Sequence, residues 1–175
     1  MGGNLDDNIF FDRSQLKYCG KNVIIGKTVR IRKPKEVSID DDTIIDDFTY
    51  ISCGITIGKN CHIASNVSIS GGEGHFYMGN HSTISNHTSV HCASSDYRKI
   101  SLDLPSVPKD KRYGGEVGDV RLGDYVVVGA HSTILPNVII PNGVAFGAYS
   151  LIKSIKYKEY HLYTGIPVKM VCKRE

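Results

Sequence analysis

The chain has 175 residues, enough for one domain of ordinary size and too few for two comfortable ones. Its hydrophobic fraction of 41% and charged fraction of 22% lie near globular averages, so the composition excludes a disordered chain, a collagen and a disulfide miniprotein. The net charge of +3 is too small to indicate nucleic acid as a partner, and the basic excess gathers in residues 153–174, which favours a small anionic ligand.

The N-terminal segment and the lengths of the apolar runs indicate where in the cell the protein is found. No run approaches the ~20 consecutive apolar residues that span a bilayer, and Met1–Phe11 carries Asp6 and Asp7 where a signal peptide has basic and then apolar residues. We therefore expect a cytoplasmic protein without a membrane span. The cysteines are odd in number, widely spaced and without a CxxC motif, which favours reduced structural thiols: Cys19, Cys53, Cys61, Cys92 and Cys172.

A repeat of six residues organises the chain, with residues 1–20 expected as a lead-in or cap and residues 21–175 as one domain. The position after each repeat residue is usually small or turn-forming, and the fourth position after it is Thr, Cys, Ser or Val. The repeat residues form three runs: Ile39, Ile45, Ile51, Ile57, Ile63 and Ile69; Met78, Ile84 and Val90; and Leu122, Val128, Ile134, Ile140, Phe146 and Ile152.

The period of six residues fits neither an α-helix nor an ordinary β-strand. A helix with 3.6 residues per turn cannot keep positions six apart on one face over five repeats, and an ordinary strand alternates every second residue. A solenoid fits, because each hexapeptide can form one short strand and a corner, and three hexapeptides complete one triangular coil. We therefore expect an all-β parallel β-helix of about five coils.

Two insertions interrupt the repeat, and insertions are where a solenoid can lift side chains off a face to make a pocket. The shorter one is Ser70–Phe76, which contains Gly71, Gly72 and Gly74. The longer one occupies about residues 91–118 and carries prolines, glycines and clustered charges. It is too long for a simple connection in a compact domain, so we expect an external loop with a function.

The whole pattern resembles the hexapeptide-repeat acyltransferases over roughly Lys21–Lys173. The most specific stretches are residues 122–130, 134–140, 146–150 and 165–169. The resemblance implies that the coils wind left-handed, whereas the general rule for parallel crossovers gives the right-handed form. It also implies a short C-terminal extension, an acyl-CoA co-substrate and a homotrimer with active sites between subunits.

Two short motifs narrow the resemblance to one branch. Gly71-Gly72-Glu73-Gly74 and Ser95-Asp96-Tyr97 are similar to a branch that acylates amino sugars carried on nucleotides. In the galactoside and maltose acetyltransferases, a His at the start of the long loop is the general base for a sugar hydroxyl, and this chain has Ser95-Asp96 there. The resemblance thus implies N-acylation of a nucleotide-linked amino-deoxy sugar for surface polysaccharide synthesis, as in lipopolysaccharide O-antigen.

Asp96 and Glu73 are the candidate catalytic carboxylates. A neutral amine attacks a thioester without prior deprotonation, so the enzyme needs only a carboxylate that holds the amine and accepts the proton shed by the tetrahedral intermediate. Asp96, alone or with Glu73, suits this task. A structural role is also open for Asp96, as an Asx turn or as a partner of Arg98.

Asn86, His91 and His87 are further candidates. Asn86 stands at a corner and can donate its amide to the oxyanion of the intermediate. His91 or His87 serves as general base in the first alternative function, the O-acetylation of a sugar hydroxyl. The second alternative is a non-catalytic or zinc-binding β-helix, because carbonic anhydrases of this fold bind zinc through three His. The spacing of His87 and His91 does not match theirs, so we expect no metal site.

The C-terminal third supplies the residues expected to bind acetyl-CoA or another acyl-CoA. In the resemblance, backbone groups at the Gly-Ala corners bind the pantetheine arm, and a larger side chain there blocks its close approach. Basic residues at the end of the solenoid then meet the phosphates of coenzyme A. The expected cofactor-binding residues are Gly129, Ala130, Gly147, Ala148, Lys153, Lys169 and Lys173, with Arg174 nearby.

Overall fold

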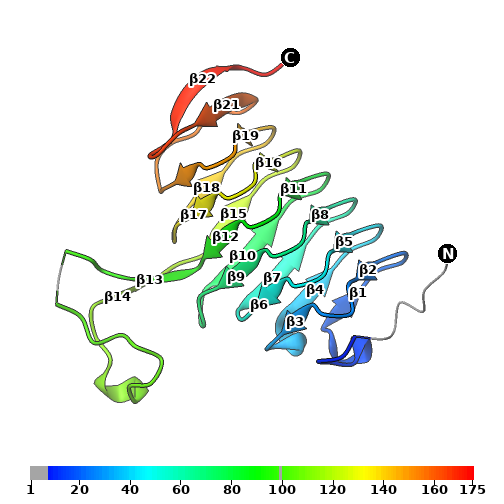
Figure 1. Cartoon of the computed structure of the whole chain (residues 1–175), viewed down its shortest axis with the longest axis vertical. Helices are drawn as coiled ribbons and strands as arrows, with labels where there is room; N and C mark the ends of the chain where they lie inside the picture. Colours follow the sequence, from blue (N-terminus) through cyan, green and yellow to red (C-terminus); the bar gives the residue numbers. More distant parts are fainter. Residues whose placement is uncertain (1–7, 99) are drawn as a thin grey trace.

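The computed structural model describes residues 8–98 and 100–175, so the expected lead-in at residues 1–20 is covered only from residue 8. In this described part, short strands form three long sheets and one two-stranded sheet (Figure 1). Within the coils, successive strands belong to different sheets, and each strand pairs with its counterpart one coil away. The molecule is therefore an all-β solenoid with three faces, the left-handed parallel β-helix expected from the sequence.

The three long sheets, here called A, B and C, are the three faces of the solenoid. Sheet A contains β1 (Tyr18–Cys19), β4 (Val37–Ile39), β7 (Gly54–Ile57), β10 (His75–Met78), β15 (Val120–Leu122) and β18 (Ile139–Ile140). Sheet B contains β2 (Ile24–Ile25), β5 (Ile44–Ile45), β8 (His62–Ile63), β11 (Thr83–Ile84), β16 (Val127–Val128), β19 (Ala145–Phe146), β21 (His161–Thr164) and β22 (Lys169–Lys173). Sheet C contains β3 (Arg30–Ile31), β6 (Tyr50–Ile51), β9 (Ser68–Ser70), β12 (Ser89–His91), β17 (Thr133–Ile134) and β20 (Leu151–Ile152).

The repeat residues form three apolar columns inside the solenoid. In sheet A, for example, Ile39 pairs with Ile57, and Ile57 pairs with Met78 one coil further on. Every repeat residue identified in the sequence is buried, which confirms the predicted core. Burying an aliphatic side chain of this size contributes about 1.5–3 kcal/mol, so these columns are the main source of stability.

One coil lies upstream of the first repeat residue identified in the sequence. Cys19, Ile25 and Ile31 are six residues apart and belong to β1, β2 and β3, so the solenoid starts before the expected boundary at residue 21. The described residues form six complete coils and, with β21, part of a seventh, instead of the five expected. The short 3-10 helix η2 (Pro34–Glu36) explains why the repeat did not reveal this first coil, because it inserts two residues into the six-residue period. Another 3-10 helix, η1 (Arg13–Gln15), precedes the first coil.

Left-handed residues and buried hydroxyls build the corners. The third residue after a repeat position takes a positive φ at most corners: Asn22, Asp42, Phe48, Asn60, Asn66, His81, His87, Tyr125, His131, Asn137 and Tyr149. The residue after it is the Thr, Cys, Ser or Val noted in the sequence. Where this residue carries a hydroxyl, it bonds a backbone carbonyl, in most cases in the next coil, as Thr43 Oγ1 does by donating to the carbonyl of Gly58 at 2.9 Å. This hydroxyl satisfies a carbonyl that the tight corner leaves without a backbone partner.

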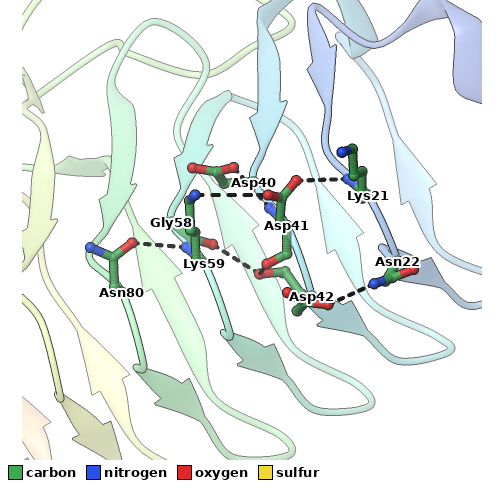
Figure 2. A network of polar contacts seen from close by, with 9 residues as sticks. Lys21, Asn22, Asp40, Asp41, Asp42, Gly58, Lys59 and Asn80 are labelled. Atoms are coloured by element: carbon green, nitrogen blue, oxygen red, sulfur yellow. Dashed lines mark hydrogen bonds and ion pairs between the residues drawn. The ribbon is translucent and has the colours of Figure 1, made fainter.

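Acidic residues at the corner between sheets A and B hold neighbouring coils together (Figure 2). Asp41 Oδ1 accepts a hydrogen bond from the backbone N–H of Lys21 at 2.7 Å, and Asp42 Oδ1 accepts one from Asn22 Nδ2 at 3.0 Å. On the opposite side, Lys59 Nζ lies 3.7 Å from Asp41 Oδ2. The run of three aspartates at 40–42 is therefore part of the scaffold.

The C-terminal extension covers the end of sheet B. β21 pairs in parallel with β19, and β22 folds back antiparallel onto β21. Arg174 anchors the last strand, because its Nη1 donates to the carbonyls of Gly143 at 2.7 Å and Tyr125 at 3.2 Å. Under the hairpin, Phe146, Tyr157 and Tyr163 form a buried aromatic cluster, and burial raises the pKa of Tyr157 to about 12.

Candidate active site

The longer insertion projects from the solenoid between β12 and β15 as an arm, here defined as residues 92–119 (Figure 1). At its root, β13 (Ala93–Ser95) pairs antiparallel with β14 (Gly115–Val117). Further out, Leu102 and Tyr113 form an antiparallel bridge, and the 3-10 helix η3 (Lys109–Lys111) lies within the arm. The expected external loop at about 91–118 is thus present, with secondary structure of its own.

A cleft of about 930 Å³, here called the arm cleft, lies between the arm, the glycine turn at residues 71–73 and the outer surface of sheet C. Its volume suits a ligand the size of a cofactor or substrate. Basic and acidic side chains line it together with exposed apolar ones: Arg32, Lys33, Lys109 and Arg112; Glu73, Asp103 and Glu116; and Tyr50, Leu104, Pro105, Tyr113 and Val117.

Glu73 lines the arm cleft but is engaged in an ion pair. Lys109 Nζ donates to Glu73 Oε1 at 2.6 Å, and both side chains are exposed. This hydrogen bond and the charge of Lys109 lower the pKa of Glu73 below its ordinary value. Glu73 is therefore a carboxylate at neutral pH, and its nearest partner is a lysine of the arm.

Asp96 adjoins the arm cleft without lining it. It lines a smaller hollow of about 390 Å³ with Arg98 and residues 114–117, and residues 114–117 also line the arm cleft. Asp96 Oδ1 accepts a hydrogen bond from the backbone N–H of Arg98 at 3.0 Å, and Arg98 Nε lies 3.4 Å from the same oxygen. Asp96 therefore has the structural role that the sequence left open, as a turn residue and a partner of Arg98. It also lies beside the arm cleft.

His91 ends β12 on the outer surface of sheet C. Its Nδ1 lies 3.4 Å from Ser70 Oγ, and Ser70 lines the arm cleft. Partial burial lowers the pKa of His91 below its ordinary value of 6.5. The imidazole is therefore neutral at pH 7, the form that a general base requires.

Asn86 and His87 lie at a different edge of the solenoid, the corner between sheets B and C. Both are exposed, and the backbone N–H of His131 in the next coil donates to the carbonyl of Asn86 at 3.1 Å. The rings of His87, His131 and Tyr149 stack along this corner with centroids 4.9 and 4.8 Å apart. Among the described residues, neither Asn86 nor His87 lines the arm cleft.

The four predicted Gly-Ala residues meet at this same corner, here called the donor corner and defined as residues 129–130 and 147–148. The N–H of Gly129 donates to the carbonyl of Phe146 at 2.9 Å, so the two Gly-Ala pairs belong to adjacent coils. A Cβ on Gly129 would lie 2.5 Å from the backbone N of Ala148, closer than real side chains approach. Coil stacking alone therefore requires this glycine, whereas the sequence analysis attributed it to the pantetheine arm.

The predicted basic residues do not form one cluster. Lys169 and Lys173 stand at the two ends of β22, about 13 Å apart at the ordinary rise of a strand. Lys153 follows β20, and all three side chains are exposed. Arg174 was expected to supply charge for phosphate, but its guanidinium binds the carbonyls of Tyr125 and Gly143. It is better described as an anchor of the C-terminal strand.

Three further properties concern the described residues only. No group of three or more His, Cys, Asp or Glu within them is arranged to hold a metal ion. None of their helices is long and apolar enough to cross a membrane. The cysteines of this part are free thiols, and Cys53, Cys61 and Cys92 are buried.

Sequence reasoning missed most of the residues that line the arm cleft. Arg32 and Lys33 precede η2 and line the cleft, although no motif in the sequence marks them. Asp103 and Arg112 belong to the charged stretch of the long insertion, which was noted but not resolved into residues. The clustered charges of the insertion were the one sequence feature that could have indicated these residues. Only the path of the arm in the structure brings them together at one cleft.

Comparison with protein families supports the fold and the repeat. Residues 36–71 match the model described as "Bacterial transferase hexapeptide (six repeats)". A curated relative, the dTDP-4-amino-4,6-dideoxy-D-glucose acyltransferase of Escherichia coli, is 31% identical over 121 residues, which is 69% of this chain and 62% of that protein. WbbJ of Escherichia coli K12, named for lipopolysaccharide O-acetyl transfer, is 33% identical over 68% of this chain and 50% of its own length. The matched region thus spans less than two thirds of either curated relative.

Solved structures extend the similarity to nearly the full chain. The N-acyltransferase AntD from Bacillus cereus, in complex with dTDP and 3-hydroxybutyryl-CoA, is 35% identical and covers 96% of this chain and 91% of its own, with a TM-score of 0.84. A maltose O-acetyltransferase from Clostridium difficile shares the fold at 17% identity, with a TM-score of 0.56 over 93% of this chain and 72% of its own. This chain belongs to the hexapeptide-repeat transferase family.

Proposed function

We propose that this protein transfers an acyl group from acyl-CoA, such as acetyl-CoA, to the amino group of a nucleotide-linked amino-deoxy sugar. The observation that carries the proposal is the arm cleft, with its basic and acidic side chains, in a chain similar to AntD over almost its entire length. One AntD variant was solved with dTDP-4-amino-4,6-dideoxyglucose and coenzyme A. The curated relative of Escherichia coli is named for the same amino sugar.

The charges of the arm cleft suit such an acceptor. Four basic side chains line it, and an Arg or Lys is the usual partner of a diphosphate. Tyr50 and Tyr113 offer aromatic surface for a base or a sugar. A nucleoside diphosphate sugar carries a diphosphate, a base and a sugar, which match these side chains. We therefore assign the cleft to the acceptor substrate.

Asp96 is proposed as the group that accepts the proton shed by the amine, with Glu73 in a supporting role through the arm. Asp96 lies beside the cleft, and its side chain is 17% exposed. Asn86 is proposed to donate to the oxyanion of the tetrahedral intermediate. Gly129, Ala130, Gly147 and Ala148 are proposed to bind the pantetheine arm, and Lys153, Lys169 and Lys173 to meet the phosphates of coenzyme A.

A homotrimer completes the proposal. The donor corner lies between sheets B and C, whereas the arm cleft lies where sheet C meets the glycine turn that leads to sheet A. Asn86 therefore stands at one edge of the solenoid and Asp96 at another. A neighbouring copy with threefold symmetry can bring one chain's donor corner to the next chain's arm cleft. Sedimentation equilibrium tests this assembly, and a monomer would contradict the proposed mechanism.

The proposal includes a role in surface polysaccharide synthesis and the cytoplasmic location expected from the sequence. An O-acetyltransferase is the second candidate, because neutral His91 beside Ser70 can serve as a general base and because WbbJ is similar to the chain. A thiol-release assay with acetyl-CoA separates the two. It compares nucleotide sugars that carry an amine with matched sugars that carry a hydroxyl. Thiol release with the amino sugars alone supports N-acylation, and release with the hydroxy sugars alone contradicts it.

A further inference from the structure

Three carboxylates line the arm cleft, and they differ in what compensates their charge. Glu73 pairs with Lys109 at 2.6 Å. Glu116 Oε1 accepts a hydrogen bond from Asn137 Nδ2 at 2.9 Å. Neither Glu116 nor Asp103 has a cation within ion-pair distance in the described part of the chain, and of these two side chains only that of Asp103 is half-buried.

Two neutral hydroxyls hold Asp103 instead. Ser95 Oγ donates to Asp103 Oδ1 at 3.1 Å, and Ser101 Oγ donates to the same oxygen at 3.2 Å. The second oxygen, Oδ2, has no hydrogen-bond donor among the described residues. A carboxylate that is half-buried at the wall of a cleft gains most from a charged donor, because hydrogen bonds between ions are about twice as strong as neutral ones.

The backbone fixes the position of Asp103. Leu102 exchanges two backbone hydrogen bonds with Tyr113, at 2.9 and 3.2 Å, which locks this segment against the returning strand of the arm. A Cβ on Gly115 would lie 2.9 Å from both Cβ and Oδ2 of Asp103. Asp103 thus packs closely against the backbone of Gly115, and this contact and the two hydroxyl hydrogen bonds position the carboxylate before any ligand arrives.

The opposite charge is also present in the cleft. Arg32 lines it and, within the described residues, its guanidinium has neither an ion pair nor a hydrogen bond. Lys33 and Arg112 are committed elsewhere, Lys33 to Glu36 and to the carbonyl of Gly72, and Arg112 to two carbonyls of the arm. Among the described residues, the guanidiniums of Arg32 and Arg112 and the carboxylates of Asp103 and Glu116 have no ion pair. The cleft is therefore complementary to a ligand that carries an anionic diphosphate and a cationic amine, and Asp103 is the half-buried one of the two carboxylates.

We propose that Asp103 binds the protonated amino group of the acceptor sugar and thereby selects amino sugars over hydroxy sugars at the binding step. This inference rests on the proposed function. It makes Asp103 a specificity-determining residue that holds the ammonium form of the amine at the binding step. The ammonium then loses one proton to solvent, and the neutral amine attacks the thioester and sheds its second proton to Asp96. A hydroxy sugar forms only a neutral hydrogen bond with the same carboxylate and is bound less tightly.

The test is equilibrium binding, without acyl-CoA, of three ligands: dTDP-4-amino-4,6-dideoxyglucose, its counterpart with a hydroxyl in place of the amine, and dTDP. Asp103→Asn keeps an acceptor for Ser95 and Ser101 but removes the charge. We expect it to weaken binding of the amino sugar by about tenfold or more, and binding of the other two ligands by less than about twofold. Asp110→Asn, the same change at an exposed position of η3 outside the cleft, is the matched control and should leave all three affinities unchanged.

Two results would overturn the inference. An equal loss for all three ligands means that Asp103 shapes the nucleotide part of the cleft. No loss for the amino sugar means that the carboxylate does not meet the amine. Thiol release by the unmodified enzyme reports separately on the proposed function. Failure of acyl transfer despite Asp103-dependent binding of the amino sugar therefore contradicts the function and leaves the binding site in place.

Discussion

Lys109 Nζ lies 2.6 Å from Glu73 Oε1, and this ion pair joins the arm to the glycine turn across 36 residues of sequence. The pair lies at the rim of the arm cleft, so it bears on how the arm is held. It also gives Glu73 a role other than proton transfer. Because both side chains are exposed, the pair stabilises the fold little, and its effect is expected on the position of the arm.

We predict that Glu73→Gln raises KM for the acceptor severalfold and changes kcat by less than about threefold, because it loosens the arm without removing a reacting group. The lowered pKa of Glu73 implies that the pair is complete above the ordinary pKa of a glutamate and is lost as pH falls through the lowered value. Steady-state kinetics and the rate of proteolysis within the arm measure the two effects. The exchange of charges in a Glu73→Lys, Lys109→Glu double variant should restore the original KM. A fall in kcat of a hundredfold in Glu73→Gln would instead place this carboxylate in the chemistry.

Asp96→Asn should lower kcat/KM by about 10²–10⁴-fold, the usual contribution of a proton-transfer group, because an amide cannot accept the proton that the amine sheds. His91→Asn should cost less than about fivefold on the same scale. Both variants keep a hydrogen-bonding side chain of similar size, so each serves as the control of the other. The reverse order of effects would favour O-acetylation with His91 as base.

The pH profile gives an independent check on His91. Burial lowers its pKa below 6.5, so if this histidine were the base, the rate would level off below that pH. An amine acceptor should instead give a rate that continues to rise toward the pKa of the amine. The sign for stability follows from the same shift: the folded state disfavours protonation of His91, so stability is lost as pH falls from about 6.5 through the lowered pKa. An NMR titration of the imidazole that gives a midpoint above 6.5 would contradict this environment.

Ala148→Leu tests the donor corner. Ala148 is exposed at this corner, so a larger side chain can project outward without disturbing the core. We expect KM for acetyl-CoA to rise by about tenfold or more, because the added side chain blocks the approach of the pantetheine arm, with little change in the melting temperature. Equal kinetics in the variant and the unmodified enzyme would place the acyl donor elsewhere.

Two isoleucines in the solenoid provide a matched pair for stability. Ile63 is fully buried in sheet B, whereas Ile139 is 65% exposed on the outside of sheet A. Ile63→Ala should lower the free energy of unfolding by about 2–5 kcal/mol, and Ile139→Ala should change it by no more than about 0.5 kcal/mol. Denaturant unfolding of the two variants measures the difference. Similar values for both would contradict the arrangement of the apolar columns.

The period of six determined the fold, because it states directly which side chains point inward. Ile39 and Ile57, for example, are three repeats apart and fall in one column through backbone pairing between adjacent coils, so their burial follows from spacing alone. The two breaks in the period likewise predicted the positions of the glycine turn and of the arm. The first coil escaped notice where two extra residues at η2 shift the register between Ile31 and Ile39.

Only the tertiary structure decided the partners of the candidate residues. The pairing of Glu73 with Lys109, the anchoring of Arg174 on Gly143 and the held carboxylate of Asp103 depend on the path of the arm and of the C-terminal strand. These segments follow no repeat, so nothing in their spacing predicts which residues meet. The sequence alone therefore determined which side chains face the interior of the solenoid, whereas contacts between distant, non-periodic segments decided the shape and charge of the cleft.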